Sequence, residues 1–84
     1  MRTLSETWDI IRTNHRGPYR LVVDRTKVSP AAKQPYRCEW LPGEVGADDV
    51  PEEAEALLTD PRDRIVRVAV WSATEGCFVG TLRA

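Results

Sequence analysis

The sequence predicts an α+β domain: a mostly antiparallel sheet of four or five strands with one short helix on one face. Three observations predict this class. Short segments rich in β-branched and aromatic residues recur along the chain, a single apolar stripe at helical spacing interrupts them, and turn-forming residues separate them. A chain of 84 residues with 42% hydrophobic and 30% charged residues has ordinary globular composition and room for one core. We therefore expect residues 1–84 to form a single domain.

The first third of the chain is expected to form a β-hairpin. Residues 7–13 (TWDIIRT) mix β-branched and aromatic side chains, which predicts a strand. Residues 14–18 contain a Gly-Pro pair and predict a turn, and residues 19–26 (YRLVVDRT) predict the second strand. Residues 27–35 contain two prolines and no periodicity, which indicates a loop.

The middle of the chain predicts a third strand and the helix. Residues 36–40 (YRCEW) alternate apolar and charged side chains, as is typical of a half-buried strand, and residues 41–47 are rich in turn formers. The helix is expected to begin after a cap at Asp48 or Asp49, with Glu52 as capping-box partner, and to end at an Asp-Pro pair. Its apolar stripe comprises Val50, Ala54, Leu57 and Leu58.

A second hairpin is expected at the end of the chain. Residues 64–72 (RIVRVAVWS) predict the strongest strand, residues 73–76 a turn with Gly76 in the left-handed position, and residues 77–83 the last strand. The expected element order is thus ββ-β-α-ββ. One helix cannot cover such a sheet, so part of the second face is expected to meet solvent, the long loop or a partner. The expected core comprises Val22, Leu57, Leu58, Val66, Val68, Val70 and Phe78, together with Trp8 and Trp40.

Few residues of the chain could perform catalysis or hold a metal. His15 is the only histidine and lies in a predicted turn, and the two cysteines, Cys38 and Cys77, lack the paired spacing of a zinc site. No phosphate-binding glycine loop, metalloprotease motif or nucleophile elbow is present. The sequence therefore favours a protein that is not an enzyme and needs no metal or cofactor. Both thiols are expected to be reduced and to lie in or near the core.

Neither a signal peptide nor a membrane span is expected. The N-terminal residues 1–11 (MRTLSETWDII) are interrupted by Glu6 and Asp9, so they lack the apolar centre of a signal peptide. The longest apolar run is only a few residues and is too short to cross a bilayer. We expect a cytoplasmic protein without a membrane partner.

Charge is segregated along the chain, although the net charge is only −1. Residues 1–37 hold eight basic and three acidic residues, a net charge of +5. Residues 38–60 hold eight acidic residues and no Lys or Arg, a net charge of −8. Residues 61–84 hold four basic and two acidic residues, a net charge of +2. This organisation by segment is the most informative feature of the sequence.

The acidic segment, residues 38–60, has two interpretations that both stay open. In the first, its carboxylates are solvated and favour the positive end of the helix macrodipole, which accounts for about half of them. In the second, it is a docking surface that imitates the phosphates bound by a basic partner. The absence of Lys and Arg favours a functional role, because a helix placed only for solubility usually mixes both signs. The candidate residues are Glu44, Asp48, Asp49, Glu52, Glu53 and Glu55.

The predicted first hairpin is rich in arginine. Nearby aromatic residues would let it contact phosphates and stack on bases. The sequence pI of about 5.8 and the lack of a nucleic-acid-binding motif favour instead that these arginines pair with the acidic segment of the same fold. The arginines are Arg12, Arg16, Arg20 and Arg25.

Trp71 is expected on the strand face opposite to the valines, together with Arg67. Either this face packs in a second layer or it forms an exposed patch, and Trp and Arg are typical of binding hot spots. The same face, or a sheet edge, would also suit the contact between two copies of the chain.

In size, lack of motifs and charge layout, the chain resembles small inhibitor proteins encoded by phages, such as anti-CRISPR proteins. The resemblance rests on those features only and assigns no residue a role. The leading hypothesis is a non-enzymatic protein-binding module that docks its acidic residues, with Arg67 and Trp71, on a basic, nucleic-acid-binding partner and inhibits it. The alternatives are a small nucleic-acid-binding domain that uses the arginine-rich hairpin, and a homodimeric structural subunit of a larger assembly.

Overall fold

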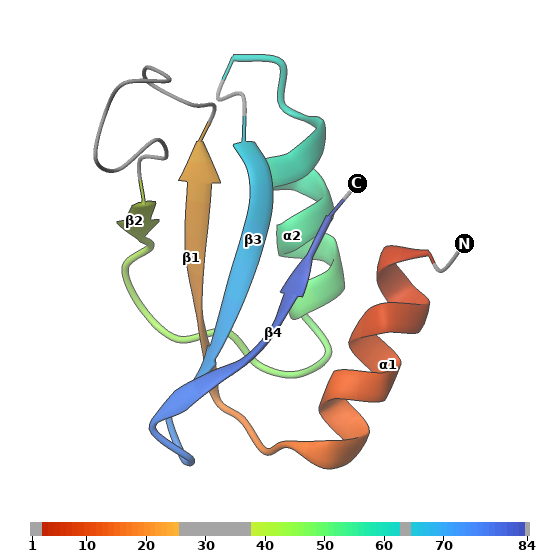
Figure 1. The fold of residues 1–84 in the computed structure, drawn as a ribbon, viewed down its shortest axis with the longest axis vertical. Coiled ribbons are helices and arrows are strands. Elements are labelled where there is room, and N and C mark those ends of the chain that lie inside the picture. Colours follow the sequence, from red (N-terminus) through yellow and green to blue (C-terminus); the bar gives the residue numbers. More distant parts are fainter. Residues whose placement is uncertain (1–2, 26–37, 63–64, 84) are drawn as a thin grey trace, which may run out of the picture.

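In the residues that the structure describes, the chain forms two helices and a four-stranded antiparallel sheet (Figure 1). The computed structural model describes residues 3–25, 38–62 and 65–83. The α+β class and the antiparallel sheet predicted from the sequence are confirmed. In chain order the elements are α1 (Leu4–Asn14), β1 (Tyr19–Arg25), β2 (Cys38–Trp40), α2 (Val50–Thr59), β3 (Ile65–Ser72) and β4 (Cys77–Leu82).

The prediction of a strand over residues 7–13 is wrong, because this segment belongs to helix α1. Thr3 caps the helix: its Oγ1 accepts a hydrogen bond from the backbone N–H of Glu6 at 3.1 Å. Trp8 and Ile11, three residues apart, lie on one side of the helix and are buried. Burial of this stripe outweighs the modest strand preference of the β-branched residues. The first hairpin therefore does not exist, and the element order is αβ-β-α-ββ, with two helices in place of one.

The sheet has the strand order β2-β1-β3-β4, with every neighbouring pair antiparallel. Strands β1 and β3 are central, and β2 and β4 form the two edges. The predicted strands over residues 19–26, 36–40, 64–72 and 77–83 are confirmed where the structure describes them, except that β4 ends at Leu82. Residues 26, 36, 37 and 64 and the predicted loop at residues 27–35 lie outside the described ranges. The predicted turn at Gly76 is also confirmed, since its φ is 69°.

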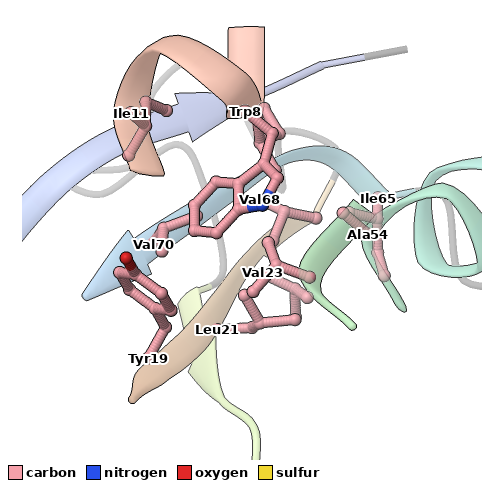
Figure 2. Packing of buried hydrophobic residues seen from close by; sticks show 11 residues of the cluster. Trp8, Ile11, Tyr19, Leu21, Val23, Ala54, Ile65, Val68 and Val70 are labelled. Carbon is pink, nitrogen blue, oxygen red and sulfur yellow. The ribbon is translucent and has the colours of Figure 1, made fainter. Parts of the chain in front are cut away.

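Both helices cover the same face of the sheet (Figures 1 and 2). Trp8 of α1 lies edge to face against Tyr19 of β1, with ring centroids 4.8 Å apart, and its indole N–H donates to the carbonyl oxygen of Ala47 at 2.8 Å. Helix α2 buries Val50 and Ala54 against the sheet. The strand residues of this core are Tyr19, Leu21, Val23, Ile65, Val68, Val70 and Leu82.

The predicted core is partly wrong. Val68 and Val70 are fully buried, and Leu57 and Leu58 pack at the edge of the core. Val66 is 42% exposed, however. The reason is a shift of the β1–β3 register between Asp24 and Arg25, which pairs Arg25 with Ile65 and brings Ile65 onto the core face where alternation predicted Val66.

The remaining predicted core residues lie on the other face of the sheet. Phe78 and Trp40 are 51% and 43% exposed, and Val22 is buried there without touching the helices' core. A second register shift, between Val70 and Trp71, aligns Phe78 with Trp71 and so places it away from the helices. Trp40 pairs with Val22 at the end of the short edge strand β2. The side of the sheet on which these residues lie depends on which face the helices cover. Alternation within a single strand does not show which face that is.

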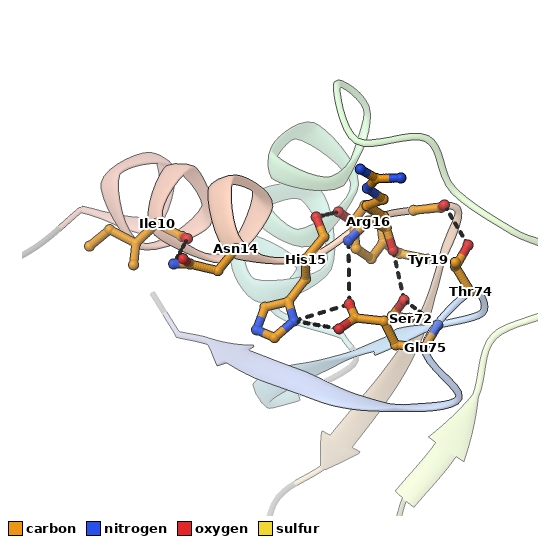
Figure 3. A network of polar contacts seen from close by, with 9 residues as sticks. Ile10, Asn14, His15, Arg16, Tyr19, Ser72, Thr74 and Glu75 are labelled. Atoms are coloured by element: carbon orange, nitrogen blue, oxygen red, sulfur yellow. Dashed lines mark hydrogen bonds and ion pairs between the residues drawn. The ribbon is translucent and has the colours of Figure 1, made fainter.

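A polar network joins the end of α1 to the β3–β4 turn (Figure 3). The carboxylate of Glu75 accepts hydrogen bonds from Nδ1 of His15 at 3.0 Å and from the backbone N–H of Arg16 at 3.3 Å. Ser72 Oγ donates to the carbonyl oxygen of Arg16 at 2.6 Å, and Tyr19 Oη donates to that of His15 at 2.9 Å. These bonds hold the connection between α1 and β1, which contains a cis Gly17–Pro18 bond, against the sheet.

The start of α2 differs from the predicted capping box. Asp49 is the N-cap residue, but its side chain makes no capping hydrogen bond. Its φ and ψ of −93° and −17° lie in the helical region. Residues whose side chains cap a helix usually have φ and ψ in the β region. Pro51 lies in the first turn, where a missing backbone N–H does not disturb the helix. Among the described residues, no helix is both long and apolar enough to cross a membrane.

Candidate functional site

One face of the sheet carries neither helix, and we call it the open face. Side chains alternate along a strand, so residues that flank the core positions point to this face. On β1 these are Arg20, Val22 and Asp24, which alternate with Tyr19, Leu21 and Val23 of the core. The open face is the part of the molecule where exposed aromatic residues gather.

Three aromatic side chains from three strands meet on the open face and form what we call the aromatic cluster: Trp40 of β2, Trp71 of β3 and Phe78 of β4. Trp71 lies edge to face with both others, at centroid distances of 5.5 Å to Trp40 and 5.0 Å to Phe78. Trp40 and Phe78 are 5.6 Å apart. Such contacts stabilise a fixed arrangement of rings while much of Trp40 and Phe78 remains in solvent.

Arg20 adds a positive charge next to the aromatic cluster. Its guanidinium carbon lies 5.0 Å from the ring centroid of Trp40, within the range of a cation–π interaction. Its Nη2 also donates a hydrogen bond to the carbonyl oxygen of Leu41 at 3.2 Å. Both contacts hold the side chain on the open face, so the cluster presents a positive charge beside the exposed rings.

A groove of about 500 Å³ runs along the open face next to the aromatic cluster. Val22 and Ala69, which pair across β1 and β3, form an apolar part of its lining. Trp40 and Phe78 line it as well, and Arg67 lines its polar end. Its volume and mostly apolar lining with a few polar groups are typical of a binding site.

Asp24 lies at the polar end of the groove, where it is 3% exposed and accepts hydrogen bonds from Cys38 and Arg67. Cys38 Sγ donates to Oδ1 at 2.8 Å, and Arg67 Nε donates to Oδ2. Burial alone would raise the pKa of Asp24, but the hydrogen bonds from Cys38 and Arg67 and the charge of Arg67 together outweigh burial and lower it. Asp24 is therefore an ionised structural group at neutral pH.

The thiol of Cys38 is bound to that carboxylate. The hydrogen bond to Asp24, followed by burial, raises the pKa of Cys38 above its ordinary value. A thiol with a raised pKa is a poor nucleophile at neutral pH. Both Cys38 and Cys77 are exposed rather than in the core, and they are free. They lie on opposite edge strands, too far apart for a disulfide.

The structure separates the predicted partner-binding residues into two groups on opposite sides of the sheet. Arg67 and Trp71 belong to the open face, whereas helix α2 carries its acidic residues on the layer that covers the other face. Within the acidic group, Asp48 forms an ion pair with Arg12 at 3.1 Å. The eight candidate residues therefore do not all lie on one face of the fold. Glu44, Asp48, Asp49, Glu52, Glu53 and Glu55 are all exposed.

The four arginines predicted to form a nucleic-acid-binding hairpin are dispersed. Arg12 lies on α1 and pairs with Asp48, and Arg16 is exposed in the connection between α1 and β1. Arg20 lies on the open face, and Arg25 at the end of β1 pairs with Glu39 at 2.9 Å. Two of the four therefore pair with the acidic segment of the same fold, as the sequence favoured.

Sequence reasoning identified Trp71 and Arg67 but assigned Trp40 and Phe78 to the core. One signal was available: charged Arg20 and Asp24 alternate with apolar core residues on β1, which marks the face that no helix covers. Among the described residues His15 contacts Glu75, Cys38 contacts Asp24, and no thiol contacts an imidazole. Within the same ranges no group of three or more His, Cys, Asp or Glu could hold a metal ion.

The open face thus combines exposed aromatic rings, a fixed arginine and an apolar groove with one charged end. These features provide shape, apolar area and charge for binding another molecule. The chain matches no protein-family model, and comparisons with curated proteins and with solved structures find no match either.

Proposed function

We propose that this protein is a non-enzymatic module that binds another protein through the open face of its sheet. One observation carries the proposal: Trp40 and Phe78 remain 43% and 51% exposed although they pack against Trp71 in one cluster. Isolated exposed apolar residues are common on protein surfaces, but a contiguous aromatic cluster beside an arginine is typical of an interaction site.

The composition of the open face suits the centre of a protein interface. Tryptophan and arginine are among the residues most enriched in binding hot spots, and the rigid ring of tryptophan loses little conformational entropy on binding. Arg20 is already held by Trp40 and by Leu41, so less side-chain freedom remains to be lost when a partner docks. The groove beside the cluster offers a recess for a partner side chain.

A protein partner is favoured over nucleic acid by the orientation of the rings. Trp71 lies edge to face with Trp40 and Phe78, at interplanar angles of 71° and 82°. A platform for bases needs exposed ring faces on which successive bases stack. The sequence pI of about 5.8 also disfavours sequence-independent attraction to phosphates.

The consequence of binding is proposed to be inhibition, in which the module covers a surface that its partner needs for its own interactions. This extends the resemblance in size and layout to small phage-encoded inhibitors, and it requires no chemistry from the module. The proposed location is the cytoplasm, which is supported by two exposed thiols, since free thiols persist in reducing compartments.

The acidic side of α2 supports a second candidate function, which is docking on a basic partner. Glu52, Glu53 and Glu55 are exposed, and in the described part of the chain none of the three forms an ion pair. Their negative charge would then attract a basic surface and speed association. Because α2 and the open face lie on opposite layers, the two candidates can be tested separately.

The test compares two double variants as baits in affinity capture from the source cell, with quantitative mass spectrometry of the captured proteins. Trp40→Ala with Phe78→Ala removes the exposed rings, whereas Glu52→Lys with Glu55→Lys reverses charge on the other layer. We expect a protein that the unchanged chain captures to be lost by the first variant and kept by the second. The opposite pattern would assign function to the acidic side of α2, and loss by neither variant would refute both candidates.

A further inference from the structure

Building on the proposed function, we propose that the groove of the open face receives an extended, acidic segment of the partner protein that inserts an apolar side chain. The proposed ligand class is therefore a peptide segment in which carboxylates alternate with aromatic or aliphatic residues. Charge complementarity and the apolar lining of the groove carry this inference.

The charges of the groove are arranged so that its outer surface is cationic. Among the described residues, Asp24 is the only carboxylate in the lining of the groove, and its side chain is 4% exposed behind the donors that bind it. Arg67, its partner, is 37% exposed at the surface. A ligand that enters the groove thus meets the positive member of the pair, while the negative member is withdrawn beneath it.

Two further arginines add to this positive charge. Arg20 lies over Trp40 on the open face. Arg83 follows β4 and is exposed, and its charge is near enough to Asp24 to help lower the pKa of that carboxyl group. With Arg67, these residues place positive charge beside both the aromatic cluster and the polar end of the groove.

The apolar lining determines the second property of the ligand. The Val22–Ala69 pair lies in the middle of the groove. The Asp24–Arg67 pair lies at one end of it, and the Trp71–Phe78 pair lies toward the other. An extended segment presents alternate side chains to one face, so one apolar residue can enter the groove while its neighbours stay at the rim. A volume of about 500 Å³ accommodates such a side chain together with adjoining backbone.

The negative charge of α2 favours approach of an acidic partner segment from the side of the open face. The exposed carboxylates of α2 repel an acidic segment, whereas the arginines of the open face attract it. Such a charge separation guides an encounter toward one face of the molecule.

The probes are four fluorescein-labelled ten-residue peptides measured by fluorescence anisotropy with the full chain. The first alternates glutamate with phenylalanine, the second and third replace every glutamate by glutamine or by lysine, and the fourth replaces every phenylalanine by alanine. We expect the glutamate–phenylalanine peptide to bind more tightly than each of the other three. Added salt should weaken its binding more than that of the glutamine peptide.

Variants connect the binding to the groove. Arg20→Gln and Arg83→Gln should each weaken binding of the glutamate–phenylalanine peptide by about fivefold, since a partly exposed charge contact contributes on the order of 1 kcal/mol. Neither should change binding of the glutamine peptide. Arg67 is left unchanged because it holds Asp24, and thermal melting of each variant separates lost binding from lost folding.

Several results would overturn the inference. Equal or tighter binding of the lysine peptide, or no binding of any peptide at about 1 mM, would exclude an acidic segment as the ligand. A ten-nucleotide single-stranded DNA that binds more tightly than every peptide would identify nucleic acid as the ligand. If these results occur while Trp40→Ala with Phe78→Ala still abolishes capture of the cellular partner, the open face remains the docking site and only the partner class is wrong.

Discussion

Arg67 on β3 donates a hydrogen bond to Asp24 on β1 across the centre of the sheet, and only the arginine reaches solvent. The pair joins β1 and β3, the two strands with the longest pairing, and lies at the polar end of the groove. Removing the arginine leaves a buried carboxylate with the thiol of Cys38 as a donor. We expect Arg67→Ala to lower the free energy of unfolding by about 1.5–3 kcal/mol in urea denaturation at neutral pH.

The control for this prediction is the double variant Arg67→Ala with Asp24→Asn, which also removes the buried charge. It should recover part of the lost stability, because residues in direct contact couple by about 0.5–3 kcal/mol in a double-mutant cycle. Strictly additive effects of the two substitutions would contradict an ion pair that stabilises the fold.

Val66 and Val68 provide a matched pair that tests the register of β3. Val68 is fully buried and Val66 is 42% exposed, although simple alternation places both on one face. Val68→Ala should lower the free energy of unfolding by about 1.5–3 kcal/mol through lost burial and a residual cavity. Val66→Ala should change it by less than about 0.5 kcal/mol. Chemical denaturation measures both, and equal effects would show that the register shift near Ile65 is absent.

These valines also show how far the sequence could predict the fold. Period-two alternation correctly predicted β2 and β3 where they are described, because it follows from local geometry. The two register shifts are set by pairing between strands, so Val66 and Phe78 were misplaced. Helix α1 had a readable signal, since Thr3 and Glu6 stand at capping-box spacing before an apolar stripe, but its β-branched residues were given more weight.

The candidate site was predictable to a smaller extent. Trp71 was recognised as a candidate because it lies opposite to the core valines within one strand. Trp40 and Phe78 could not be recognised in that way, since the aromatic cluster depends on the order β2-β1-β3-β4 and on which face both helices cover. Charge segregation correctly suggested internal pairing, as the Arg12–Asp48 and Arg25–Glu39 contacts show.

Gly80 tests the packing of α1 on β4. A Cβ atom added at Gly80 would lie 2.5 Å from Cδ1 of Ile11, so Gly80→Ala requires the isoleucine to move. We expect Gly80→Ala to destabilise the protein by about 1–3 kcal/mol. Ile11→Val removes the clashing methyl group, and Gly80→Ala should cost less stability in that background. A double-mutant cycle in urea measures this coupling, and its absence would contradict the position of α1.

The contact of His15 with Glu75 predicts a dependence of stability on pH. The hydrogen bond from His15 lowers the pKa of Glu75 below its ordinary value of 4.5. A carboxyl group with a lowered folded-state pKa stabilises the fold above its unfolded pKa, and this contribution is lost as pH falls through the folded pKa. We therefore expect Glu75→Gln to lower stability at neutral pH and to reduce the loss of stability on acidification.

Urea midpoints measured from about pH 7 down to about pH 2 test this prediction. Glu44→Gln is the matched control, since it neutralises another exposed glutamate in a loop that is remote from His15 in the chain. Asp24 contributes with the same sign in both proteins, because its pKa is lowered as well. An acid limb that is equally steep with Glu75→Gln and without it would exclude Glu75 as a contributor.

Charge reversal on α2 tests whether its acidic side stabilises the fold or only contacts solvent. Glu52 and Glu53 lie in the first turn, where negative charge interacts favourably with the helix macrodipole, whereas Glu55 lies beyond it. We expect Glu52→Lys to lower the free energy of unfolding by about 0.3–1 kcal/mol and Glu55→Lys to change it by less than about 0.5 kcal/mol. Salt should reduce the first effect, because screening weakens interactions between exposed charges. Urea denaturation at low and high salt measures both variants. A loss of unfolding free energy above about 2 kcal/mol in either variant would contradict the exposed position of the substituted glutamate, because substitutions at exposed sites rarely cost that much.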